Sequence, residues 1–183
     1  MSTTPENNNL EIYIPLVSLF ITNFSVFMLA VEKRDNSLID TYWSANFIVT
    51  CATIVLFRET MAPRALLVTG LVTLWGLRLT VHIALRHAEE NREDPRFAEM
   101  RRAWAEAGGE AGVLWRSYLF LFLPQVLVVV ILGSAAFYAC LASNEDDELN
   151  GFDFNGILLF LIGLSIETVA DFQLREFRRQ KRR

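Results

Sequence analysis

Three basic residues in the middle of the chain have the spacing of one helix face. Arg78, His82 and Arg86 are four residues apart in the segment LVTLWGLRLTVHIALRH, and side chains spaced by four are neighbours on a helix. A charge at membrane depth costs at least about 2–3 kcal/mol if it faces lipid. Arg78 should therefore bind an anionic ligand from the inner side, pair with a buried carboxylate, or extend its guanidinium to the membrane surface. The sequence supports the ligand site and the structural alternatives equally.

A second polar group lies in the C-terminal segment GLSIETVADFQLREFRRQKRR. Spacings of four, four and three place four charged residues on one helix face: Glu167, Asp171, Arg175 and Arg178. Carboxylates at membrane depth need partners, and the third apolar segment carries the candidates. The predicted buried polar cluster consists of Arg78, His82, Glu167 and Asp171.

No metal site and no disulfide framework are predicted. His82 and His87 are five residues apart, so they do not share a helix face as a metal-binding pair would. Cys51 and Cys140 fall in different apolar segments. Two isolated cysteines make neither a zinc motif nor a disulfide framework, and we expect both to be small packing residues.

Membrane helices must position these groups. Of 183 residues, 52% are hydrophobic, and five apolar segments approach the roughly 20 residues that a spanning helix needs. Lipid offers no hydrogen bonds, so only helices or closed barrels span it, and the segments do not alternate as barrel strands do. Three prolines lie near segment starts, where a missing N–H costs little: Pro15, Pro63 and Pro124. We expect an all-α integral membrane protein, a bundle of about five transmembrane helices in a single domain, residues 1–183, with spans at residues 12–31, 38–57, 65–85, 117–142 and 154–174.

The basic residues predict the orientation. Of 17 Lys and Arg residues, 14 fall on one side if the N-terminus is outside, and only Arg58 and Arg64 fall on the other. The positive-inside rule then places the C-terminus inside. No secretory signal or Arg-rich presequence is recognisable, so the mitochondrial inner membrane, the endoplasmic reticulum and the bacterial inner membrane are not distinguished. Expected partners are membrane lipids and other membrane-protein subunits, not nucleic acid.

Four short blocks, in this order, resemble a known family. They are SLIDTYW, LWGLRL, REDPRF and GLSIETVADFQLREFRR, and the resemblance covers residues 37–183. The pattern is similar to that of an uncharacterised membrane family related to the steroid 5-alpha reductases. The matching residues are Asp40, Trp43, Trp75, Gly76, Arg78, Leu79, Glu93, Asp94, Arg96, Phe97, Ala170, Asp171, Gln173, Leu174 and Phe177.

The resemblance implies a helical membrane fold that holds NADPH in a pocket open to the inner side and delivers hydride to an activated carbon–carbon double bond. By resemblance, Asp171, Arg175 and Arg178 contribute to the cofactor site, and no catalytic residue is identified. The chain departs from the family because no Arg-His-Pro-Asn-Tyr run follows the last block, and Phe97 stands where many relatives have tyrosine. We therefore expect no complete NADPH site, and no activity, in the isolated chain.

Three functions are compatible with these features. The first is a non-catalytic accessory or structural subunit of a larger membrane complex, for example a respiratory one. It is favoured because the chain lacks the Arg-His-Pro-Asn-Tyr run of the family. The second is one half of an NADPH-dependent membrane reductase for a lipid or steroid-like enone, favoured by Asp171 and Arg178. The third is a lipid- or sterol-binding module without redox chemistry.

Overall fold

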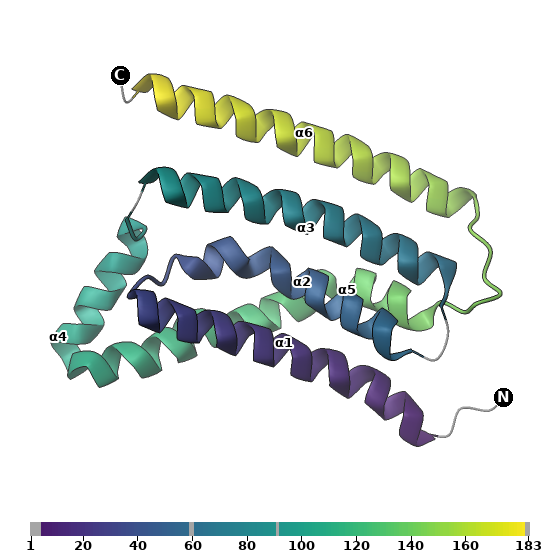
Figure 1. Cartoon of the computed structure of the whole chain (residues 1–183), viewed down its shortest axis with the longest axis horizontal. Coiled ribbons are helices and arrows are strands. Elements are labelled where there is room, and N and C mark those ends of the chain that lie inside the picture. Colours follow the sequence, from purple (N-terminus) through teal and green to yellow (C-terminus); the bar gives the residue numbers. More distant parts are fainter. Residues whose placement is uncertain (1–4, 59–60, 91, 182–183) are drawn as a thin grey trace. The chain divides into compact units, whose positions relative to one another are not determined.

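The chain divides into two compact units, Met1–Glu145 and Asp146–Arg183. The computed structural model describes residues 5–58, 61–90 and 92–181, with side chains from residue 11 onward. All regular elements of this described part are helices (Figure 1). The single membrane domain expected from the sequence stays a prediction.

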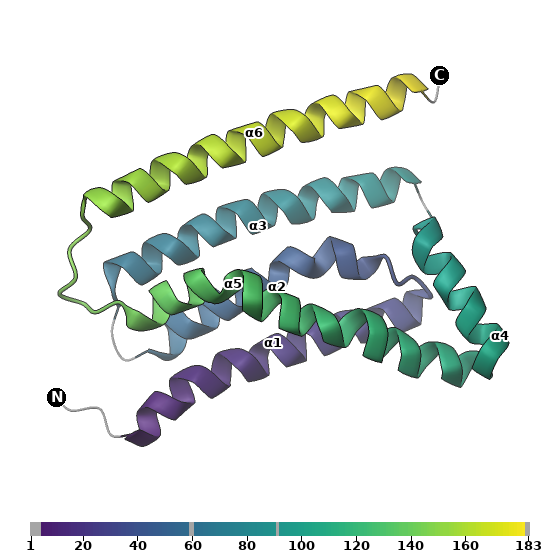
Figure 2. The same cartoon turned by 180° about the vertical axis from the view of Figure 1, so that it is seen from behind.

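The helices of both units agree with the apolar segments. The first unit contains α1 (Pro5–Lys33), α2 (Leu38–Phe57), α3 (Pro63–Glu90), α4 (Pro95–Ser117), the π-helix η1 (Tyr118–Phe122) and α5 (Leu123–Ala142), as Figure 1 and Figure 2 show from opposite sides. The second unit contains α6 (Gly151–Lys181). Five helical segments of the described residues are long and apolar enough to cross a membrane: Glu11–Lys33, Leu38–Phe57, Pro63–Glu90, Pro95–Ala142 and Gly151–Lys181. The prediction of an all-α, multi-pass membrane protein is thereby confirmed.

The fourth apolar segment is preceded by a helix that its composition did not indicate. Asp94 caps the start of α4, because its side chain accepts a hydrogen bond from the backbone N–H of Arg96, and Pro95 occupies the first turn. The helix bends at Gly108 and Gly109, where Gly109 has a φ of 61°, a conformation that favours glycine. The chain then enters η1 and α5. The expected spans ended at residue 85 and resumed at residue 117, so they predicted no helix between them.

Pro15 differs from its expected place near a helix start. The structure begins α1 at Pro5, so Pro15 lies well inside that helix. The apolar stretch begins at Ile12, but the helix extends into the polar residues before it, which hydropathy does not indicate. Because Pro15 has no N–H, it cannot donate to the carbonyl oxygen of Glu11 one turn earlier, and the helix loses one backbone hydrogen bond there.

The core of the first unit is built around α2, which contacts α1, α3 and α5. Ser44 Oγ donates a hydrogen bond of 2.9 Å to the carbonyl oxygen of Gly76 on α3. This close approach needs glycine, because a Cβ atom at Gly76 would lie 2.8 Å from the side chain of Ile48. Trp43 and Phe47 pack edge-on against Trp75 of α3, with ring centroids 6.4 and 5.6 Å away. The LWGLRL block therefore holds α3 against α2.

Both cysteines belong to this core. Cys51 on α2 and Cys140 on α5 are free, fully buried members of one hydrophobic cluster, where both pack against apolar side chains. Nearby, Arg58 donates to the carbonyl oxygens of Leu141 and Ser143, both over 2.6 Å, and also to that of Cys140. Because the last carbonyls of a helix lack internal partners, Arg58 caps the C-terminus of α5.

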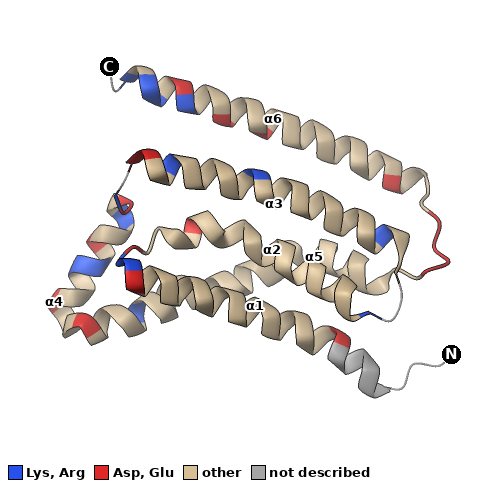
Figure 3. Cartoon of the chain, in the orientation of Figure 1, with Lys and Arg blue, Asp and Glu red and all other residues tan. Residues whose placement is uncertain are grey.

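The charged residues of the first unit gather at one end. Figure 3 shows them where α1 and α3 end and where α2 and α4 begin. We call this the charged end. The opposite end, where α2 and α5 finish, carries Arg58 and Arg64. The structure thus brings the basic residues at the end of α1 and those at the end of α3 to the same end of the unit, as the orientation prediction requires. It does not identify the side of the membrane.

The second unit is one long helix. At its start, the backbone N–H of Phe152 donates to the Asn150 side chain over 2.9 Å, and the N–H of Asn150 donates to Asp153 over 2.8 Å. These bonds satisfy backbone groups at the helix N-terminus. The last turn is basic, with Arg178, Arg179 and Lys181, which complements the helix dipole.

Candidate functional site

The turn between α1 and α2 is the centre of a polar network at the charged end. Arg34 has a φ of 53°, and the N–H of Asp35 bonds the carbonyl oxygen of Ala30 over 2.9 Å. The side chain of Asp35 then accepts the N–H of Ser37 over 2.9 Å. These local bonds reverse the chain tightly and present the next residues to α3 and α4.

The REDPRF loop is bonded directly to this turn. The backbone N–H of Asn36 donates to Glu93 Oε1 over 2.9 Å, and the N–H of Asp94 donates to Ser37 Oγ over 2.7 Å. On the other side, Asn36 Nδ2 donates to the buried Ser117 Oγ over 3.1 Å. The α1–α2 turn therefore connects the end of α3, the start of α4 and the end of α4.

Ion pairs reinforce the same network. His87 Nε2 lies 2.8 Å from Asp35 Oδ2, and Arg101 Nε donates to Glu93 over 3.0 Å. Arg96 bridges two carboxylates, since it lies 3.0 Å from Asp94 and 3.5 Å from Asp40. Hydrogen bonds from the Arg96 side chain hold the pKa of Asp94 below its ordinary value. We call the network the polar clasp; its members are Asp35, Asn36, Ser37, Asp40, His87, Glu93, Asp94, Arg96 and Arg101.

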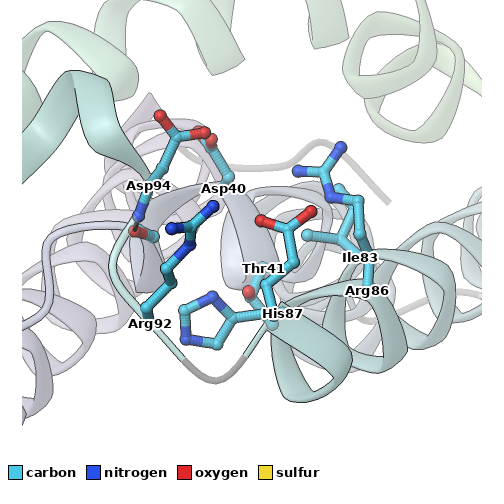
Figure 4. Close-up of a pocket in the computed structure, with 9 residues that line it drawn as sticks. Asp40, Thr41, Ile83, Arg86, His87, Arg92 and Asp94 are labelled. Carbon is cyan, nitrogen blue, oxygen red and sulfur yellow. Dashed lines mark hydrogen bonds between the residues drawn. The ribbon is translucent and has the colours of Figure 1, made fainter. Parts of the chain in front are cut away.

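A small cavity lies beside the clasp, between the start of α2 and the end of α3 (Figure 4). Its enclosed space is about that of one water molecule. The buried Thr41 Oγ1 lines it and has no hydrogen-bond partner among the described residues. The lining residues are Ser37, Asp40, Thr41, Ile83, Arg86, His87, Glu90, Arg92 and Asp94.

Two of the four sequence blocks meet at this clasp, and a third packs against α2 elsewhere. SLIDTYW supplies Asp40 to the cavity and Trp43 to the aromatic contact with Trp75 of LWGLRL. REDPRF supplies Asp94 and Arg96. The resemblance had linked these blocks only by family, because sequence spacing alone does not say which loop reaches the start of α2. The roles of Asn36 and Ser37 were missed, since side chains that bond to backbone groups in turns leave no distinctive spacing.

The three basic residues predicted on one face of α3 do not all reach this site. Gly76 faces α2, and Arg78 follows two residues later, about 200° around a helix of 3.6 residues per turn. Arg78 and His82 do not line the cavity, whereas Arg86 does. The predicted row of three basic residues therefore divides, and only its end nearest the charged end joins the polar clasp region.

The predicted cofactor residues belong to the second unit. Asp171, Arg175 and Arg178 lie in the last turns of α6, on one side of that helix by their spacing. Their predicted role at a cofactor, and the pairing of Glu167 and Asp171 with α3, stay predictions. Among the described residues, no group of three His, Cys, Asp or Glu side chains is arranged to hold a metal ion.

Comparison with known proteins identifies the family. A family model described as a protein of unknown function, DUF1295, matches residues 26–183. No curated protein and no solved structure matches the chain. The matched region includes all four sequence blocks and every helix from the last part of α1 onward. The chain therefore belongs to the DUF1295 family.

Proposed function

We propose that this chain is a non-catalytic structural subunit of a larger membrane assembly, for example a respiratory one. The observation that carries the proposal is the polar clasp. Charged side chains of two matched sequence blocks bond one another there, since Arg96 pairs with both Asp94 and Asp40, and the enclosed space beside them is about that of one water molecule.

A cofactor pocket at the polar clasp would require this network to open. Small-molecule sites usually enclose about 300–1,000 Å³, far more than a water-sized cavity. Opening it would separate Glu93, whose side chain is only 7% exposed, from Arg101, whose side chain is 35% exposed. Breaking this half-buried pair costs about 2–3 kcal/mol, because the Glu93 carboxylate is left uncompensated. The network is better suited to fixing helices than to admitting a dinucleotide.

A reductase-like membrane fold retained as a scaffold accounts for both the helix bundle and the clasp.

Native electrophoresis tests the proposal. The tagged full chain, extracted from its own membrane in mild detergent, should migrate in a complex several times its own mass, and its deletion should lower the amount of that complex. A chain that migrates alone under these conditions, and whose deletion leaves every larger complex unchanged, would contradict a structural role.

A second candidate is part of an NADPH-dependent membrane reductase acting on a lipid or steroid-like enone. It is favoured by Asp171, Arg175 and Arg178, which lie on one side of α6 by their spacing. Membranes that contain the chain would then oxidise NADPH when a steroid-like enone is added. Asp171→Asn should abolish that activity, and Arg102→Gln, an exposed change on α4, should not.

A further inference from the structure

The hydroxyl of Thr41 is a buried polar group without a partner. Thr41 is 5% exposed, its Oγ1 forms no hydrogen bond within the described structure, and it lines the cavity (Figure 4). Other hydroxyls of α2 are satisfied by the helix itself, since Thr50 and Thr53 donate to carbonyl oxygens one turn earlier, each over 2.7 Å. Buried polar groups are nearly always bonded, so the Thr41 hydroxyl needs a bonding group inside the cavity.

Two guanidinium groups lie at the same cavity. Arg86, in the last turns of α3, and Arg92, just after it, both line the space (Figure 4). Among the described residues, neither forms a hydrogen bond or an ion pair, in contrast to Arg101, which is bound to Glu93. Two arginines with an adjacent hydroxyl are the donor set that binds phosphate oxygens.

The cavity is not simply basic, however. Asp40 and Asp94 lie across it from Arg86 in Figure 4, and Arg96 neutralises only part of their charge because it is shared between them. Glu90 adds a further carboxylate to the lining. A plain phosphate ion would be repelled by these groups, whereas a ligand that carries both a phosphate and a cation matches both sides.

The position of the cavity favours a lipid head group. It lies at the charged end, where the apolar helices α2 and α3 respectively begin and end, and therefore at the depth of lipid phosphates. The water-sized interior admits one phosphate oxygen to Thr41. The remainder of the phosphate would stay at the mouth, between Arg86 and Arg92.

We propose that this cavity binds the head group of phosphatidylethanolamine. The phosphate accepts hydrogen bonds from Arg86, Arg92 and the Thr41 hydroxyl, and the primary ammonium group donates to Asp40. A primary ammonium can hydrogen-bond a carboxylate, which the trimethylammonium of phosphatidylcholine cannot do. This inference does not depend on whether the chain is a structural subunit or a reductase.

Native mass spectrometry of the detergent-solubilised full chain tests the site. After incubation with equal amounts of phosphatidylethanolamine, phosphatidylcholine and phosphatidylglycerol, the protein should retain the first at least about tenfold more than the others. Thr41→Val should reduce this retention about tenfold, since it removes one hydrogen bond to a charged group, and Thr41→Ser should restore it. Arg102→Gln on α4 is the matched control and should change nothing.

Several results would overturn the proposal. Equal retention of the three lipids, or a folded Thr41→Val chain with unchanged preference, would mean that the cavity holds water only. If Thr41→Val does not fold, the same lipid measurement is made on Arg92→Gln, which changes the exposed mouth of the cavity. An unchanged lipid preference in that variant contradicts the site. Displacement of the lipid by inorganic phosphate or glycerophosphoethanolamine at equal concentration would assign the cavity to a soluble ligand.

Discussion

The backbone N–H of Asp94 donates a hydrogen bond of 2.7 Å to the hydroxyl of Ser37, 57 residues earlier in the chain. This bond, with the one from Asn36 N–H to Glu93, fixes the REDPRF loop on the start of α2. Residues of two sequence blocks that match the family pattern therefore have a structural role, because they join the start of α2 to the start of α4. This role is the basis of the polar clasp.

Glu93→Ala should destabilise the first unit. The change removes an ion pair with Arg101 and an acceptor of the Asn36 N–H, so we expect a loss of about 2–3 kcal/mol. Thermal unfolding in detergent can be followed with a thiol-reactive dye, because Cys51 and Cys140 are fully buried until the chain unfolds. Glu99→Ala, an exposed change on α4, is the control, and equal unfolding temperatures for the two variants would contradict the clasp.

Gly76→Leu should separate α3 from α2. A Cβ atom at Gly76 already meets Ile48 at 2.8 Å, whereas one at Gly70 of the same helix meets nothing within 4 Å. Overpacking of this kind typically costs about 1–3 kcal/mol. Gly70→Leu removes the helix-destabilising effect of glycine in open space and should be neutral or stabilising. The same dye assay compares the two, and a Gly76→Leu chain as stable as Gly70→Leu would disprove the close approach.

Much of the fold could be predicted from apolar segments alone. The α2 bounds, Leu38–Phe57, agree with the predicted span, because helix and apolar segment begin and end together there. The same criterion missed α4, since its charged residues lie outside the membrane core, and it missed the helical residues before Ile12 for the same reason. Hydropathy identifies the helices that are apolar enough to span a membrane, but not the polar helices that the chain also forms.

The candidate site was less predictable. The spacing of Arg78, His82 and Arg86 predicted that they share a face of α3. Of the three, only Arg86 lines the cavity. Spacing along a helix does not say which turn of that helix lies beside a cavity. The clasp depends on backbone donors of Asn36 and Asp94. Such donors exist at every residue, so only the three-dimensional course of the chain shows which ones are used.

The carboxylates of α6 should pair with the Arg78 face of α3. Glu167 lies about 24 Å along α6 from Gly151, and Arg78 lies about 22 Å along α3 from Pro63, at 1.5 Å per residue. The two charges would thus reach similar depths if both helices start at the same membrane surface. Asp171→Leu should then lower the yield of folded protein more than Arg179→Leu does. Equal yields, measured by size-exclusion chromatography, would count against the pairing.

The N-terminus should lie outside and the C-terminus inside. The expectation rests on the distribution of 17 basic residues, because positively charged loops stay on the cytoplasmic or matrix side. Asn7→Cys should react with a membrane-impermeant maleimide added from outside, while Cys51 and Cys140 stay protected by burial. If position 7 is labelled only from the cytoplasmic or matrix side, the predicted topology is wrong and the opposite orientation holds.

The most direct test of a structural role is calorimetric titration of the detergent-solubilised chain with NADPH. Basic residues at the end of α6 and near the clasp attract any polyanion, so the proposed function predicts weak binding that disappears as salt screens the charges and that does not distinguish NADPH from NADH. Micromolar, salt-resistant binding with a clear preference for NADPH would contradict the structural role and make the reductase the better account.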